Sequence, residues 1–206
     1  MTDPQNEVIA GLISRLYYTQ AGIGPSVQTQ IEVPRALLAI ADQSAEARDK
    51  IIQALIELIE DTADGGEDTA FSIASDLLGK LKATEAIDTL VKYLDYQPGK
   101  IGSSLNYRPA VKGLIQIGEA IIPKVKEALI SGKSVLAESN QRLRNNAVTA
   151  LLHIGGAQAR GVLERAYSMH QDENLRDWIR FAIGKIDRAE AEKGSYVTRP
   201  RPGNLI

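Results

Sequence analysis

Residues 143–156 read Leu-Arg-Asn-Asn-Ala-Val-Thr-Ala-Leu-Leu-His-Ile-Gly-Gly, and this stretch decides the predicted fold. Its apolar residues fall on one face of a helix with a period of 3.6 residues. The residues of that face are Ala147, Ala150, Leu151 and Ile154. Gly155 follows where a left-handed cap ends such a helix. Two further helical patterns follow, over residues 157–170 and 172–187. The second again has an apolar helix face that is followed by a glycine, here Gly184.

The same pattern recurs with a regular period along the chain. The first helix of each predicted pair ends at Asp42, Gly79, Gly118, Gly155 and Gly184. These ends lie 37, 39, 37 and 29 residues apart. The position five residues before each end is mostly small, as at Ala74 and Gly113, which allows close approach between helices. Such a period is typical of helical repeats, in which each pair buries its apolar face against its neighbours.

The period predicts one folded domain over residues 1–190. A first helix is expected over residues 5–19, and the repeats cover roughly 32–61, 67–96, 107–131, 140–170 and 172–190. In the first repeat, helices are predicted over 32–42 and 45–60, with Pro34 in the first turn and Ser44 as an N-cap. Residues 191–206 are expected to form an extended basic tail, because prolines and glycines interrupt any helix there.

The composition also predicts an all-α fold. The 206 residues are 44% hydrophobic and 24% charged but only 5% aromatic, so Ala, Leu and Ile carry most of the apolar surface. Cysteine is absent, which excludes disulfides and cysteine-ligated metal sites. The N-terminus lacks the pattern of a secretory signal, and no apolar stretch is long enough to cross a bilayer. We therefore expect a cytoplasmic protein with no membrane partner.

Two phrases carry a resemblance to a known family. The pattern Ala-Val-x-x-Leu-x-x-Ile-Gly occurs at 110–118 and 147–155, and Asp-x-Asn-x-Arg-x-x-x-x-x-Ala-Ile-Gly-Lys-Ile-Asp occupies 172–187. These resemble HEAT repeats, in particular the short bacterial type found in the bilin (phycobilisome) lyases of light-harvesting antennae. The resemblance covers roughly residues 32–190. It implies a right-handed α-solenoid of about four to five helical pairs.

Charge is distributed unevenly between the two halves of the chain. Residues 1–99 hold 7 basic and 16 acidic residues, a net charge of −9, whereas residues 100–206 hold 17 and 10, a net charge of +7. In an elongated protein this asymmetry orients charged partners during encounter. The basic half is expected to meet an acidic protein surface. The alternative is that both ends carry ordinary solvated faces.

Residues suited to catalysis are scarce in this sequence. The two histidines, His153 and His170, are explained by packing and by the dipole at a helix end. No histidine pair has metal-ligand spacing, and no phosphate-binding loop or Gly-x-Ser-x-Gly elbow occurs. We therefore predict no catalytic residue and no metal site, and the chain is more simply explained as a non-enzyme.

The predicted binding surface follows from the resemblance, because the second helices of HEAT-like pairs line the concave side. Here these helices are 84–95, 120–131 and 157–170. Candidate partner-binding residues on this face and its rim are Lys92, Tyr93, Tyr96, Tyr107, Arg108, Lys124, Glu127, Arg160, Glu164, Arg165 and His170. Tyr and Arg are enriched at binding hot spots. The competing interpretation is that these are ordinary side chains extending from the core.

Three functional hypotheses follow. The first is a non-enzymatic scaffold, adaptor or chaperone that holds an acidic protein partner and uses no cofactor. The second, implied by the family, is a bilin lyase or chromophore-handling chaperone that works as a heterodimer, with Tyr93 or Tyr96 stacking on the bilin. The third is a HEAT-like nucleic-acid binder, which the acidic half of the chain disfavours.

Overall fold

The computed structural model describes residues 4–17, 24–63, 68–97, 108–132 and 140–197, and these form helices without any strand. This part of the protein is all-α, as predicted. The helices are α1 (Pro4–Ser14), α2 (Val27–Ala41), α3 (Ala45–Ala63), α4 (Asp68–Lys80), α5 (Ile87–Lys92), α6 (Pro109–Ile117), α7 (Ile122–Ser131), α8 (Asn140–Ile154), α9 (Gly156–Met169) and α10 (Glu173–Val197). Across the described ranges, no helix is both long and apolar enough to span a bilayer.

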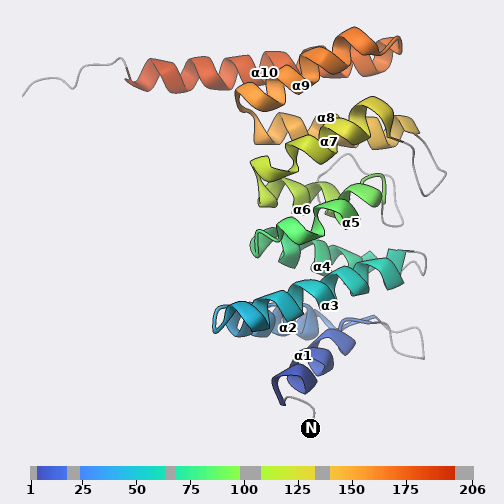
Figure 1. Cartoon of the computed structure of the whole chain (residues 1–206), viewed down its shortest axis with the longest axis vertical. Helices are drawn as coiled ribbons and strands as arrows, with labels where there is room; N and C mark the ends of the chain where they lie inside the picture. Colours follow the sequence, from blue (N-terminus) through green and yellow to red (C-terminus); the bar gives the residue numbers. More distant parts are fainter. Residues whose placement is uncertain (1–3, 18–23, 64–67, 98–107, 133–139, 198–206) are drawn as a thin grey trace, which may run out of the picture.

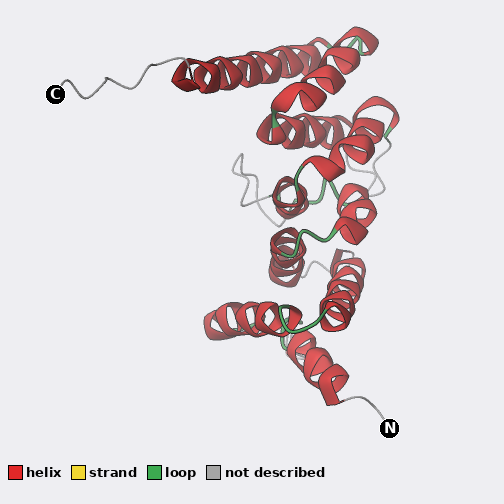
Figure 2. Ribbon diagram, turned by 60° about the vertical axis from the view of Figure 1, so that its left-hand side comes forward, coloured by secondary structure: helices red, strands yellow, loops and turns green. Residues whose placement is uncertain are grey.

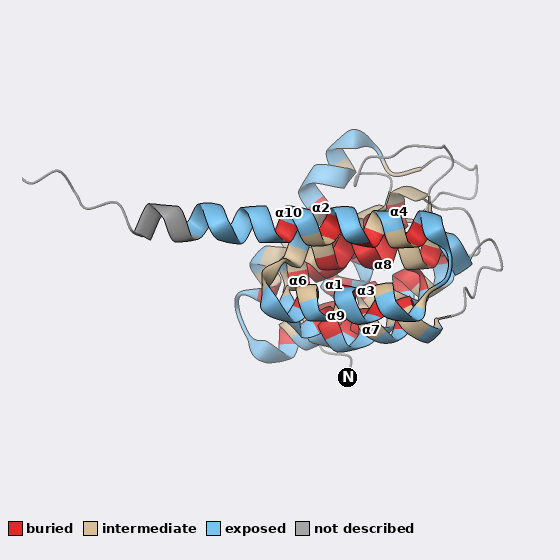
Figure 3. Cartoon of the chain, turned by 90° about the horizontal axis from the view of Figure 1, so that it is seen from above, coloured by how far each residue is buried: buried red, intermediate tan, exposed pale blue. Residues whose placement is uncertain are grey.

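The helices stack in two columns along the long axis of the molecule (Figures 1 and 2). In one column α4 contacts α6, α6 contacts α8, and α8 contacts α10. In the other, α3 contacts α5, α5 contacts α7, and α7 contacts α9. Figure 3, which looks along the long axis, shows the buried residues between the columns and α10 extending beyond the other helices. Neither column buries its apolar residues without the other.

Several helix ends lie where the sequence predicts them. Ser44 Oγ accepts a hydrogen bond from the Ala47 N–H at 3.1 Å, which confirms the N-cap of α3. Gly118 ends α6 with φ of 100° and Gly155 follows α8 with φ of 67°, conformations that residues with a Cβ rarely adopt. These glycines end the first helices of two pairs because the chain must turn there into α7 and α9.

Two helices extend further than predicted. α2 begins at Val27, where Ser26 Oγ accepts from the Thr29 N–H, so Pro34 lies inside the helix and not in its first turn. α10 continues through Gly184 as far as Val197, so residues 191–197 are helical and not part of an extended tail. A glycine in an open helical position lowers stability without forcing a turn, so Gly184 does not end the helix. Residues 198–206 lie outside the described residues.

α4 and α6 cross closely at Gly79 and Gly113. Both glycines are buried. A Cβ added to Gly113 would lie 2.6 Å from the carbonyl oxygen of Ser75, and one added to Gly79 would lie 3.0 Å from the carbonyl oxygen of Gly113. A side chain at Gly79 would first meet the side chain of Gln116, whereas one at Gly113 would meet the backbone of Ser75, which cannot shift cheaply. Gly113 is therefore the position at this crossing that is least tolerant of a side chain.

A carboxylate joins the same two helices beside the glycines. Asp76 on α4 receives Lys80 Nζ at 2.7 Å and Lys112 Nζ of α6 at 2.6 Å. Gln116 of α6 donates to the same carboxylate at 3.2 Å. Burial alone raises the pKa of Asp76, but hydrogen bonds from Lys112, Lys80 and Gln116 outweigh it and lower the pKa below its ordinary value.

Replacement of Gly113 by alanine tests the close crossing. We expect Gly113→Ala to lower the free energy of unfolding by about 1–3 kcal/mol, because the new methyl overlaps the Ser75 carbonyl. Gly161 on α9 has open space around its Cβ position and serves as the matched control. Gly161→Ala should raise the free energy of unfolding by about 0.5–1 kcal/mol. Urea denaturation measures both, and equal effects would contradict the close crossing.

The lowered pKa of Asp76 predicts a pH-dependent contribution to stability. A carboxyl with a lowered folded-state pKa stabilises the protein above its unfolded value, near 3.8, and loses that contribution as the pH falls through the folded-state value. Wild type should therefore exceed Asp76→Asn in free energy of unfolding at neutral pH, and the difference should shrink below about pH 4. Urea denaturation over a pH series measures this, and a difference independent of pH would exclude it.

Candidate functional site

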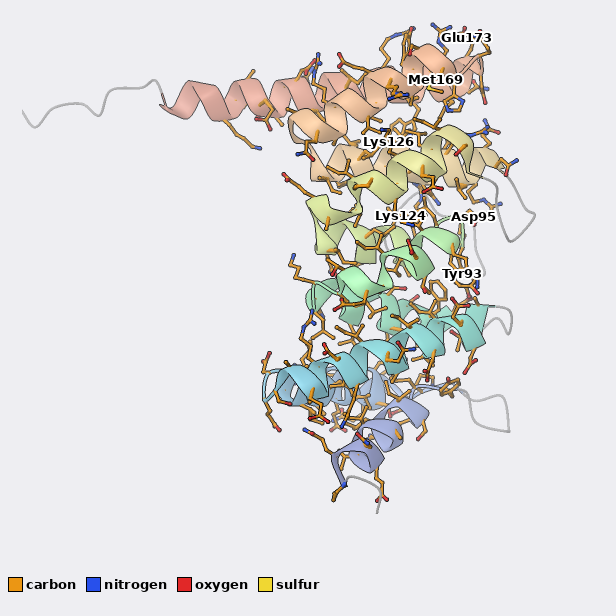
Figure 4. All side chains as sticks on the ribbon, in the orientation of Figure 1. Tyr93, Asp95, Lys124, Lys126, Met169 and Glu173 are labelled. Atoms are coloured by element: carbon orange, nitrogen blue, oxygen red, sulfur yellow. The ribbon has the colours of Figure 1, made fainter. Side chains whose placement is uncertain are left out.

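The second-helix face is the surface formed by the exposed side chains of α3, α5, α7 and α9. Six of the predicted residues lie on three of these helices: Lys92, Lys124, Glu127, Arg160, Glu164 and Arg165. Figure 4 shows Lys124 on α7, between the layers of α5 and α9. Tyr107 lies outside the described residues. The four remaining candidates flank the helices and serve mainly as contacts between them.

Three of the predicted residues line one groove on the second-helix face. Lys92 of α5 and Lys124 and Glu127 of α7 border a cavity of about 410 Å³. Asp88 and Ser131 add polar groups, while Val91, Ala128 and Leu143 supply apolar surface. We call this the α5–α7 groove. Its volume lies within the range of pockets that hold small ligands or the anchoring side chains of a partner.

The cations around this groove are paired with carboxylates of neighbouring helices. Lys92 Nζ lies 2.5 Å from Glu60 Oε2 of α3, and Lys124 Nζ lies 2.9 Å from Asp88 Oδ1 of α5. Each carboxylate accepts a hydrogen bond from its lysine, which raises the pKa of Lys92 and of Lys124. The lysines thus link α3 to α5 and α5 to α7, and the groove they border carries balanced charge.

The cations of α9 differ from one another. Arg160 donates to Asp187 of α10 at 2.6 Å and to Glu164 at 2.6 Å. Its pKa is raised, first by the hydrogen bond to Asp187. Arg165 is exposed and forms no ion pair within the described part of the chain. Met169, one turn further on the same helix, is 50% exposed. Arg165 is therefore available to a partner without breaking an internal contact.

Tyr93 and Tyr96, which the sequence predicts at an open rim, are buried. Their side chains are 4% and 7% exposed. Phe71 of α4 stacks on Tyr96 with ring centroids 4.1 Å apart and meets the edge of Tyr93 at 5.9 Å. The hydroxyl of Tyr93 donates to Glu60 and that of Tyr96 to Asp68. Both tyrosines therefore belong to the core between α3, α4 and α5, and neither presents a ring face to a ligand.

Arg108 and His170 are predicted rim residues that contact neighbouring helices. Arg108 Nη1 donates to Thr149 Oγ1 of α8 at 3.2 Å, and partial burial lowers the pKa of its guanidinium. His170 Nε2 lies 3.0 Å from the carbonyl oxygen of Leu129 in α7. His153 Nδ1 lies 2.9 Å from the carbonyl oxygen of Thr149 on the same helix, α8. Arg108 and His153 therefore both contact Thr149, whereas His170 contacts α7.

The sequence prediction missed Asp88, which lines the groove, and Glu60, which pairs with Lys92 at its border. A signal was present, because Asp88 and Lys124 are 36 residues apart, close to the repeat period. Residues one period apart occupy equivalent places in adjacent helices, so opposite charges at such positions form pairs. Glu60 and Lys92 are 32 residues apart, less than one period, so the period does not predict their pairing.

In the described ranges, no three His, Asp or Glu side chains gather closely enough to hold a metal ion. A comparison with models of known protein families finds none that matches this chain, and no curated protein matches it either.

The contrasting positions of Tyr93 and Lys124 make a testable prediction. Tyr93→Ala should lower the free energy of unfolding by about 3–5 kcal/mol, because it empties a buried site beside Phe71. Lys124→Ala removes only an exposed ion pair and should leave the stability nearly unchanged. Thermal and urea denaturation distinguish the two. A Tyr93→Ala protein as stable as wild type would place the ring on the surface after all.

Proposed function

We propose that this protein is a HEAT-like α-solenoid that binds another protein through its second-helix face and catalyses no reaction. The spacings of 37, 39 and 37 residues between Asp42, Gly79, Gly118 and Gly155 support the repeat assignment. The contacts of each helix with its counterpart in the next layer agree with it. On this proposal the fold is a right-handed solenoid of four to five helical pairs, with α1 at one end and α10 at the other.

One observation carries the binding proposal, namely the α5–α7 groove. It combines an apolar wall with ion pairs at its border, and cavities of this kind suit the anchoring side chains of a partner. Arg165 on α9 extends the same face with a cation that has no internal ion pair in the described part. A partner that carries a carboxylate opposite Arg165 and an apolar side chain opposite Val91 fits this surface.

A chromophore-handling role is the second candidate, and the α5–α7 groove is the feature that favours it. The ammonium groups of Lys92 and Lys124 at its border suit the propionates of a bilin. The buried rings of Tyr93 and Tyr96 give this role no stacking surface. We therefore place protein binding first. The nucleic-acid hypothesis has no supporting feature on the second-helix face, whose cations are largely paired.

Capture from the native cell extract, at low and moderate salt, tests the proposal. We compare wild type with Arg165→Glu and with Lys124→Glu, which reverse charge on the second-helix face. Lys193→Glu on α10 is the matched control, because it reverses an exposed cation outside this face. We expect about a fivefold or greater loss of a stoichiometric protein partner with the first two variants and full capture with the control.

The same experiment distinguishes the alternatives. Equal capture by all four proteins, with unchanged helicity in circular dichroism, would exclude the second-helix face as the binding surface. Visible absorbance in the eluate that depends on Lys124 would favour the chromophore role. An eluate rich in nucleic acid would favour the third hypothesis.

A further inference from the structure

α2 carries two apolar faces, one buried in the core and one that is exposed at its N-terminal end and half-buried at Pro34 and Leu38. The first face holds Val33, Leu37 and Ala41, which are buried in the core. A second stripe repeats at intervals of four, three and four residues along the same helix. It consists of Val27, Ile31, Pro34 and Leu38. Val27 is 74% exposed and Ile31 is 43% exposed. An amphipathic helix needs one apolar face to fold, so the exposed side chains of Val27 and Ile31 are not explained by the packing of α2.

Three residues of this stripe line a groove between α2, α4 and α6. Figure 2 shows α2 from the side where α4 and α6 are seen nearly end-on, so its axis crosses theirs. The crossing leaves a cavity of about 380 Å³, which we call the α2 groove. Its apolar wall includes Ile31, Leu38, Ile73 and Leu77. The tight crossing of α4 and α6 has no counterpart here, and the groove remains open.

The border of the α2 groove carries an excess of positive charge. Arg35, Lys80 and Lys112 line it together with one carboxylate, that of Asp76, which gives a net charge of +2. Lys80 and Lys112 share this carboxylate, at 2.7 and 2.6 Å. Each ammonium has three N–H donors, so both keep donors for a second acceptor. Arg35 is exposed and has no ion pair among the described residues.

The positive charge of the α2 groove contrasts with the negative net charge of the part of the chain that forms most of it. Residues 1–99 carry a net charge of −9, yet the groove that lies mostly among them is cationic. The α5–α7 groove, by contrast, is bordered by two lysines and two carboxylates and is neutral. An apolar wall next to an excess of cations is complementary to one kind of chain, with acidic and apolar side chains close together.

We propose that the α2 groove binds an acidic, leucine-rich or isoleucine-rich peptide segment of a partner protein. The apolar side chains of the segment cover Ile31 and Leu38, while its carboxylates accept hydrogen bonds from Arg35, Lys80 and Lys112. In an extended segment alternate side chains point in opposite directions, which lets one segment contact both the wall and the border. A nucleic acid would satisfy the cations but leave the apolar stripe uncovered. This site lies apart from the second-helix face and does not rest on the function proposed for it.

Fluorescence anisotropy with a defined probe tests this site. The probe is a short peptide of alternating leucine and glutamate that carries a neutral dye. Its comparison peptide has glutamine in place of glutamate, and a labelled single-stranded oligonucleotide tests polyanion binding. We expect saturable binding of the glutamate peptide that weakens as salt is added, and about tenfold weaker binding of the glutamine peptide.

Variants locate the binding on the molecule. Arg35→Glu should lower the affinity for the glutamate peptide by about tenfold, because it removes a cation from the groove. Ile31→Ser should lower the same affinity by about threefold, because it removes a part of the apolar wall. Lys193→Glu makes the same charge change on α10 and should alter the affinity by less than about twofold. All these positions are exposed, and circular dichroism checks that each variant keeps its helices.

Three outcomes would overturn the proposal. The first is no saturable binding of the glutamate peptide. The second is equal weakening by Arg35→Glu and Lys193→Glu, which would indicate attraction to the whole protein and no defined site. The third is tighter binding of the oligonucleotide that is lost in Arg35→Glu and kept in Ile31→Ser, which would assign the groove to a polyanion.

Discussion

The approach of two backbones at Gly79 and Gly113 is the constraint on which the stack depends. α4 holds α3 on one side, and α6 holds α8 on the other, so the α4–α6 crossing joins the two ends of the molecule. Side chains elsewhere in the core tolerate some change of shape, but a methyl group at Gly113 would meet the Ser75 carbonyl. Asp76 joins α4 to α6 beside the glycines through the lysines on either side of it. Steric fit and charge therefore act at the same place.

The two faces of the molecule use charge in different ways. On the second-helix face, Glu60, Lys92, Asp88 and Lys124 form pairs that pass from one helix to the next, so their first role is to hold the layers in register. Exposed pairs of this kind contribute little stability individually. They do fix the order of charges that a partner must match. On the opposite face, Lys80 and Lys112 share one carboxylate, which leaves an excess of positive charge beside an apolar stripe.

The tyrosines show why residue type alone is a weak guide to a binding surface. Tyr93 and Tyr96 have the chemistry of hot-spot residues, and they follow a helix of the predicted binding face. α5 ends at Lys92, however, and beyond it the chain bends so that both rings pack on Phe71. In this position their hydroxyls donate hydrogen bonds to Glu60 and Asp68, respectively. A short helix followed by an irregular segment does not keep the periodicity on which the prediction relied.

The sequence by itself determined the helical class, the period of the pairs and the caps at Ser44, Gly118 and Gly155, because apolar spacing and cap chemistry are local properties. It also identified Lys92, Lys124 and Glu127, which share one groove. Only the tertiary structure decided how far α2 and α10 extend, since Pro34 is tolerated inside α2 and Gly184 inside α10. It also decided which charges are paired and where α2 leaves its second apolar stripe uncovered. Those features depend on distances between helices, which periodicity along one chain does not specify.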